Sequence, residues 1–191
     1  MFRYPDKPIR ATPAVLDTLA DGDWLAQFKY DGWRDLIRWD GERATHTSRH
    51  NQPLPVSSAI IAETHALLRG LPPMLLDSEW TGRRNGLRER VYLFDLLEWS
   101  GAWLGNTGAE DRFRKLRAEV RERAHLVSIA DGWTEGYREL FEESRKDDRY
   151  EGIVLKRCSG RFIGSVRDSV ENPAMLKIKW RAGESGTTKV A

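Results

Sequence analysis

The sequence predicts an α+β domain with mostly antiparallel sheets and flanking helices. Many short segments are apolar or alternate between apolar and polar residues, as strands do, whereas only a few have a helical period. Asp40-Gly41 separates two alternating segments and is a strong hairpin signal, which favours antiparallel pairing. The 191 residues are enough for one large domain with a substantial apolar core.

Composition excludes several classes of protein. Hydrophobic residues make up 40% and charged residues 31%, which indicates a folded soluble chain rather than a disordered one. The 31 basic and 29 acidic residues give a net charge of +2, so any nucleic-acid contact must come from a local basic cluster. The single cysteine, Cys158, excludes an intramolecular disulfide. The sequence shows neither a signal peptide nor a membrane span, so we expect a cytoplasmic monomer.

The chain should begin with an arm, a short helix and a strand. Residues 1–10 contain two prolines and are expected to form an extended arm. Thr12 can cap a short helix that runs to residue 19, because Pro13 suits the first helical position. Alternation of apolar and polar residues then predicts a strand over residues 24–29.

The hairpin signal connects two further strands and is followed by a helix. The strands are expected over residues 33–39 and 43–48. Ser57 or Ser58 can cap an amphipathic helix, which Gly70 closes.

The middle of the chain should contain two buried strands and a charged helix. Apolar runs predict the strands over residues 74–80 and 91–98, separated by an arginine-rich loop over residues 81–90. That loop could contact a nucleic-acid backbone or simply be solvated. Residues 112–123 mix arginine with glutamate, so we expect a helix whose charges lie on the surface.

In the last third of the sequence we expect four strands, one helix and a tail. The strands are expected over residues 126–130, 152–157, 162–166 and 175–180, and the helix over residues 134–146. Residues 1–180 then form the domain, and residues 181–191 form a flexible tail or a truncated linker.

Five short motifs carry the chemistry. A lysine amine attacks phosphorus only when it is unprotonated, so a nucleophilic lysine needs nearby cations or desolvation. Period-2 alternation puts Lys177 and Lys179 on one side of their strand. Taken singly, each motif also fits a solvated loop, a core residue or a charged edge strand. In chain order the motifs are Lys29-Tyr30-Asp31-Gly32-Trp33-Arg34, Asp77-Ser78-Glu79, Tyr92-Leu93-Phe94-Asp95, Glu151-Gly152-Ile153-Val154-Leu155-Lys156 and Leu176-Lys177-Ile178-Lys179.

This ordered series resembles the motifs of the covalent nucleotidyltransferases, which include ATP-dependent DNA ligases, RNA ligases and mRNA capping enzymes. The resemblance covers residues 27 to 180, and chance would have to supply each of the five motifs independently. The residues within the motifs, together with Ser48-Arg49 between the first two motifs, are similar to those of ATP-dependent DNA ligases. The resemblance implies the ATP-grasp-like nucleotidyltransferase fold of those ligases.

The resemblance also implies a role for each candidate residue. Lys29 would be the nucleophile that forms lysyl-AMP from ATP, and Lys177 and Lys179 would neutralise the phosphates. Glu151 would bind Mg²⁺, while Glu79 would hold the ribose and help to arrange the metal. Gln27 would read the adenine edge, and Phe94 and Val154 would contact the two adenine faces. Arg34 and Arg49 would contact either the AMP or the 5′-phosphate of the nick.

The implied function is the catalytic core of an ATP-dependent DNA ligase that seals nicked duplex DNA. An RNA ligase, a GTP-using capping enzyme and a non-catalytic module that binds nucleic-acid ends are the alternatives. Related ligases carry a second, OB-fold domain after the last motif, and no such set of strands is expected here. A partner protein or separate OB-fold domain could supply it, and without it we expect slow self-adenylylation from ATP.

Overall fold

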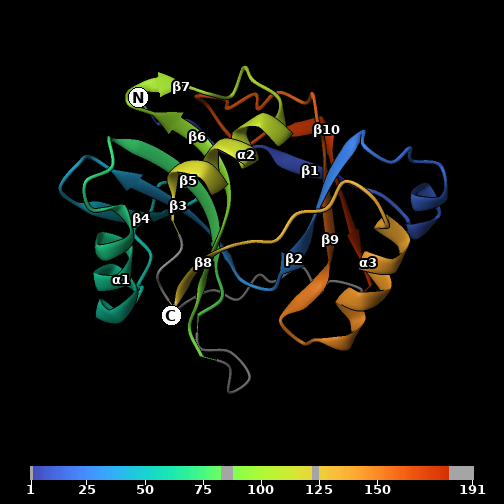
Figure 1. Ribbon diagram of the computed structural model, residues 1–191, viewed down its shortest axis with the longest axis horizontal. Coiled ribbons are helices and arrows are strands. Elements are labelled where there is room, and N and C mark those ends of the chain that lie inside the picture. The colour runs from blue at the N-terminus through green and yellow to red at the C-terminus, as the bar shows by residue number, and fades with distance from the viewer. Residues whose placement is uncertain (1, 83–87, 122–124, 181–191) are drawn as a thin grey trace.

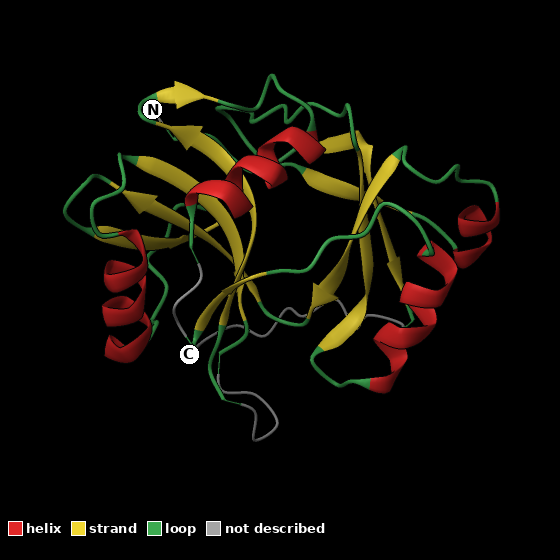
Figure 2. Ribbon diagram, viewed as in Figure 1, coloured by secondary structure: helices red, strands yellow, loops and turns green. Residues whose placement is uncertain are grey.

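A computed structural model describes residues 2–82, 88–121 and 125–180. Two sheets dominate it, and helices lie around them (Figure 1). The predicted α+β class is therefore confirmed, although the sheets are mixed: each sheet has one parallel pair of strands, while the other pairings among the described strands are antiparallel. The helices flank the sheets, with Ser58–Leu68 (α1) and Tyr137–Glu143 (α3) on opposite sides of the molecule (Figure 2).

The first sheet combines both ends of the domain. Its strand order is β1, β10, β9, β2, so the N-terminal arm forms an edge strand beside the last motif. The strands run over Lys7–Arg10 (β1), Glu171–Lys179 (β10), Tyr150–Arg157 (β9) and Trp24–Tyr30 (β2). One face packs on α3 through a buried cluster that includes Ala26, Ile153 and Ile178. The other face is therefore the one that can carry chemistry.

The second sheet contains the hairpin and the two buried strands. Its order is β4, β3, β5, β6, β7, with β8 beside β6. Its strands run over Trp33–Trp39 (β3), Ala44–Ser48 (β4), Met74–Trp80 (β5), Val91–Trp99 (β6), Ala102–Trp103 (β7) and Val127–Ile129 (β8). The predicted hairpin is confirmed, since Trp39 pairs with Ala44 across the Asp40-Gly41 turn.

Three α-helices and two 3₁₀ helices complete the described part of the fold. Ser57 caps α1, because its hydroxyl accepts a hydrogen bond from the Ile60 amide. The largest core cluster joins α1 and α2 to the second sheet through residues such as Ile60, Leu68 and Leu116. The helices run over Pro13–Asp17 (η1), Ser58–Leu68 (α1), Ala109–Glu119 (α2), Tyr137–Glu143 (α3) and Ser144–Lys146 (η2).

The predicted strand over residues 162–166 is wrong. The carboxylate of Asp6 accepts hydrogen bonds from the amides of Ile163 and Gly164, and Phe162 donates its amide to the Gly105 carbonyl. These backbone groups are therefore satisfied without a neighbouring strand. Gly164 also has a φ of 60°, which a strand residue does not adopt.

The charged helix is also not purely a surface element. α2 begins three residues earlier than predicted, and Arg112 is buried against Asp95. Its guanidinium donates to both carboxylate oxygens of Asp95, at 2.8 and 2.9 Å. The predicted end of this helix at residues 122–123, part of the arginine-rich loop (residues 83–87) and the tail 181–191 lie outside the described residues.

Candidate active site

The register of the first sheet aligns the predicted lysines in two rows. Lys29, Gly152 and Lys179 are opposite one another on β2, β9 and β10, and Gln27, Val154 and Lys177 form the next row. Residues that are opposite in neighbouring strands project on the same face. The expectation that Lys177 and Lys179 share a side is therefore confirmed, and Lys29 lies on that same side.

Glu151 reaches this face through a β-bulge. Lys29 is paired with Gly152 and Tyr30 with Tyr150, so Glu151 is the extra residue on its strand. Its carboxylate forms an ion pair with the Lys29 amine and accepts a hydrogen bond of 2.6 Å from Lys179 Nζ. Although burial opposes ionisation, the positive charge of Lys29 and the bonds from the two lysines lower the pKa of Glu151. The carboxylate therefore stays charged between the two amines.

Gly152 makes this bulge possible. Its φ is 143°, in the region that favours glycine. A Cβ atom at this position would overlap the Ile178 carbonyl oxygen on the neighbouring strand. The Glu-Gly pair is thus a structural unit in which the glycine allows the close approach of β10 and the glutamate faces the lysines.

We predict that Gly152→Ala destabilises the fold by roughly 2–5 kcal/mol, because backbone strain and overpacking add. Urea unfolding monitored by circular dichroism measures this difference. Gly22→Ala is the matched control, since Gly22 has a φ of 83° but a Cβ added there would meet no atom within 4 Å. It should cost about 1 kcal/mol. Equal losses in the two variants would show that contact with β10 is unimportant.

Gln27 has an unusual environment beside these lysines. Only 2% of the residue is exposed, and neither its amide nitrogen nor its amide oxygen makes a hydrogen bond to any residue that the structure describes. An unsatisfied buried amide costs about 1–3 kcal/mol. A hydrogen-bonding ligand would recover that cost, so this position fits recognition of a base edge. Val154, directly opposite on β9, can form an apolar wall.

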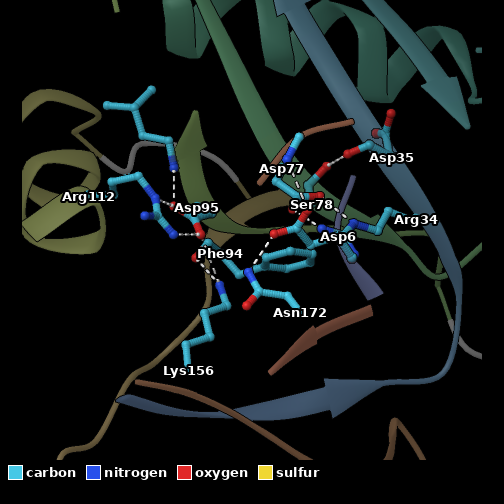
Figure 3. A network of polar contacts seen from close by, with 12 residues as sticks. Asp6, Arg34, Asp35, Asp77, Ser78, Phe94, Asp95, Arg112, Lys156 and Asn172 are labelled. Atoms are coloured by element: carbon cyan, nitrogen blue, oxygen red, sulfur yellow. Dashed lines mark hydrogen bonds and ion pairs between the residues drawn. The ribbon is translucent and has the colours of Figure 1, made fainter. Parts of the chain in front are cut away.

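The second sheet contributes Arg34, Asp77 and Glu79. Arg34 is paired with Glu79 in the register of β3 and β5. Its guanidinium binds both carboxylate oxygens of Asp77 and donates to the Asp6 carbonyl at 2.7 Å (Figure 3). Several donors of Arg34 are thus already engaged within the protein, and its predicted phosphate contact stays a prediction.

Glu79 is electrostatically linked to Lys29. Burial is the main cause that raises its pKa from 4.5 to about 7; Lys29 and Arg34 counteract this rise, and Glu151 and Asp77 add to it. A carboxyl group with a raised pKa binds its proton more tightly in the folded state. The protonated Glu79 carboxyl group therefore contributes its full stabilisation below pH 4.5, and this stabilisation is lost as the pH rises through 7.

We therefore predict that Glu79→Gln flattens the pH dependence of stability. At pH 8 the variant should be more stable than the wild type, because the buried negative charge is gone, whereas at pH 5 the two should be nearly equal. Urea unfolding at both pH values measures the difference. Parallel pH profiles would contradict the raised pKa.

Phe94 is placed by a second bulge. Ser78 is paired with Leu93 and Asp77 with Asp95, so Phe94 is the extra residue on β6. Its ring lies 5.6 Å from the Arg34 guanidinium carbon and 4.8 Å from Lys156 Nζ. The ring is partly exposed and contacts two cations, and its role as a platform for a base stays a prediction.

A buried charge network behind Phe94 was not predicted. Lys156 donates to the Phe94 carbonyl at 3.0 Å and lies 3.3 Å from Asp95, which also binds Arg112 (Figure 3). Asp95 is 1% exposed, and loss of one partner from such a buried pair typically costs about 3–5 kcal/mol. The network thus fixes the backbone that carries Phe94. One signal for this network was available in the sequence: Asp95 lies in an apolar strand segment, and Arg112 follows on an amphipathic helix.

The two remaining predicted contacts are Arg49 and Lys177. Arg49 is exposed in the turn after β4, where its Nε donates to His50 Nε2 at 3.1 Å. Lys177 is half-buried, and burial together with the charges of Lys29, Lys179 and Arg10 lowers its pKa. The structure therefore gathers Gln27, Lys29, Glu151, Lys177 and Lys179 on one sheet face, and Arg34, Glu79 and Phe94 on the facing strands.

The predicted resemblance to ATP-dependent DNA ligases is confirmed by solved structures with the same fold and by curated relatives in sequence. Mycobacterial DNA ligase D complexed with ATP and MES superposes with a TM-score of 0.66 at 22% identity, over 93% of this chain and 60% of that chain. The Chlorella virus DNA ligase-adenylate structure gives a TM-score of 0.55 at 17% identity, over 92% of this chain and 67% of that chain. These two likenesses establish the fold.

The sequence is homologous to enzymes named LigD. The Mycobacterium tuberculosis multifunctional non-homologous end joining DNA repair protein LigD is 28% identical over 94% of this chain, as is its Mycobacterium bovis counterpart. The chain spans only 26% of the length of these curated relatives. No protein family model matches the sequence. Among the described residues, no helix is long and apolar enough to cross a membrane.

Proposed function

We propose that the chain is the catalytic core of an ATP-dependent DNA ligase that forms lysyl-AMP on Lys29. The observation that carries this proposal is the shared carboxylate of Glu151, which contacts the Lys29 and Lys179 amines on one sheet face. An ordinary surface lysine is solvated by water. It would not need a carboxylate that is held in place by a β-bulge dependent on Gly152. The unsatisfied buried amide of Gln27, one row away, supplies a base-recognition group on the same sheet face.

The residues present fit ATP and Mg²⁺. Phe94 and Val154 offer apolar surfaces for the adenine, and Gln27 offers both a donor and an acceptor for its edge. Mg²⁺ prefers oxygen ligands and usually takes one or two carboxylates together with substrate phosphates. Glu151 and Glu79 are the two carboxylates that would hold it. Because the described part of the chain has no group of three acidic, histidine or cysteine side chains, phosphate oxygens would complete the coordination. The ion would supply positive charge to the phosphates.

Three displacements at phosphorus complete the reaction. The uncharged Lys29 amine attacks the α-phosphorus of ATP, pyrophosphate leaves, and the amine loses a proton to solvent. A 5′-phosphate oxygen at the nick then attacks the AMP phosphorus, the P–N bond breaks, and the Lys29 nitrogen takes a proton from solvent and leaves as an amine. Finally the 3′-hydroxyl attacks the activated 5′-phosphate and loses its proton to solvent, and AMP leaves. Lys177 and Lys179 stabilise the negative charge that spreads over the phosphate oxygens.

Nicked duplex DNA is the proposed substrate, and the similarity to LigD suggests that the nicks arise during DNA repair. The longer relatives leave room for further domains, so a separate OB-fold domain or partner protein could complete the enzyme. We propose that the chain acts as a monomer in the cytoplasm.

Intact mass spectrometry after incubation with ATP and Mg²⁺ tests the proposal. A single added AMP that maps to Lys29 is the expected result, with no comparable adduct from GTP. Sealing of a nicked DNA duplex, but not of an otherwise identical nicked RNA, then separates a DNA ligase from an RNA ligase. Absence of the adduct together with tight binding to nicked DNA would favour a non-catalytic module that binds nucleic-acid ends.

A further inference from the structure

Arg10 extends the positive row of the first sheet by one strand. In the parallel pairing of β1 and β10, Arg10 is opposite Lys177, and the Ala11 amide donates to the Lys177 carbonyl at 3.0 Å. Opposite residues in a parallel pair project on the same face. Across the sheet, the row therefore runs Gln27, Val154, Lys177, Arg10. Figure 1 shows β1 directly beside β10.

Arg10 lies among other cations on this sheet face. Arg10 is exposed, and its positive charge is among the causes that lower the pKa of Lys177. Within the described part of the chain it takes part in no ion pair, whereas Glu151 is already shared between Lys29 and Lys179. Four cations thus share one face, where Glu151 lies between Lys29 and Lys179 and the charge of Glu171 acts on Lys177. Such repulsion is tolerated at a surface that receives a polyanion.

We propose that Arg10 is a further phosphate-binding residue of this site. The inference rests on the proposed function and adds a residue outside the five motifs. An arginine guanidinium binds phosphate oxygens bidentately, and an exposed side chain can reach beyond the strand edge. The phosphate is either the pyrophosphate part of ATP or a backbone phosphate of the nicked duplex. Both are phosphate oxyanions, and experiment separates them.

Arg10→Ala tests the proposal against a matched control, Arg114→Ala. Arg114 is also an exposed arginine, but it is paired with Glu110 and Asp111 on α2. The measurements are binding of inorganic pyrophosphate by calorimetry, the KM for ATP in lysyl-AMP formation, and the affinity for a 5′-phosphorylated nicked duplex at several salt concentrations.

A pyrophosphate contact predicts about tenfold weaker pyrophosphate binding and a similar rise in the KM for ATP. A duplex contact predicts unchanged pyrophosphate binding, weaker duplex binding and a salt dependence whose logarithmic slope falls by about one. Either result supports the proposal. If Arg10→Ala matches Arg114→Ala in all three measurements, the proposal is overturned. Wild-type protein that forms no lysyl-AMP would instead contradict the proposed function, and the two binding assays would still decide the role of Arg10.

Discussion

Replacing Lys29 with alanine is expected to abolish the AMP adduct completely. Alanine has no nucleophile, and Lys177 and Lys179 lie on a different strand, two strands away from β2. Removing the amine also leaves Glu151 paired with Lys179 alone, so the fold keeps a satisfied carboxylate. Mass spectrometry after incubation with ATP and Mg²⁺ measures the loss, and urea unfolding checks that the variant is folded.

A nick that already carries AMP on its 5′-phosphate provides the sharper comparison. Sealing of this substrate does not require a new bond to Lys29, so Lys29→Ala should retain it within roughly tenfold of the wild type. Lys146→Ala is the matched control, because Lys146 is an exposed lysine paired with Glu143. An AMP adduct on the Lys29→Ala variant would assign the nucleophile to another residue.

The sequence allowed much of the site to be predicted because its pattern is local. Alternation along β10 fixed the common side of Lys177 and Lys179, and the Asp40-Gly41 turn fixed the pairing of β3 with β4. The order of the motifs gave the resemblance. Long-range pairing did not follow from periodicity: nothing in residues 7–10 indicated that they would lie beside β10, which is why Arg10 went unnoticed.

The two β-bulges, in β9 and β6, could not be predicted from the local alternation of residues along a strand. A strict period of two would turn Glu151 away from Lys29, because adjacent residues project on opposite faces. The extra residue in β9 reverses this, and the extra residue in β6 does the same for Phe94. Likewise, Arg112 looks like a surface residue until the fold brings it to Asp95, seventeen positions earlier. Such bonds depend on tertiary contacts that no short window contains.

Lys179→Ala is expected to slow lysyl-AMP formation by about a thousandfold, comparable to the loss of a positioned cation in other phosphoryl-transfer enzymes. Two effects act in the same direction. The transition state loses a cation, and Glu151 loses one of the two amines that hold its carboxylate in position. Single-turnover adenylylation with saturating ATP measures the rate of the chemical step.

Lys179→Arg separates these two effects, because it keeps the positive charge but changes the geometry of the 2.6 Å bond to Glu151. If charge alone matters, the arginine variant should recover most of the rate. If the position of Glu151 matters as well, it should stay well below the wild type. A loss of less than tenfold in Lys179→Ala, with the fold intact, would mean that the cation lies outside the reacting centre. The shared carboxylate would then be a structural contact rather than part of the adenylylation site.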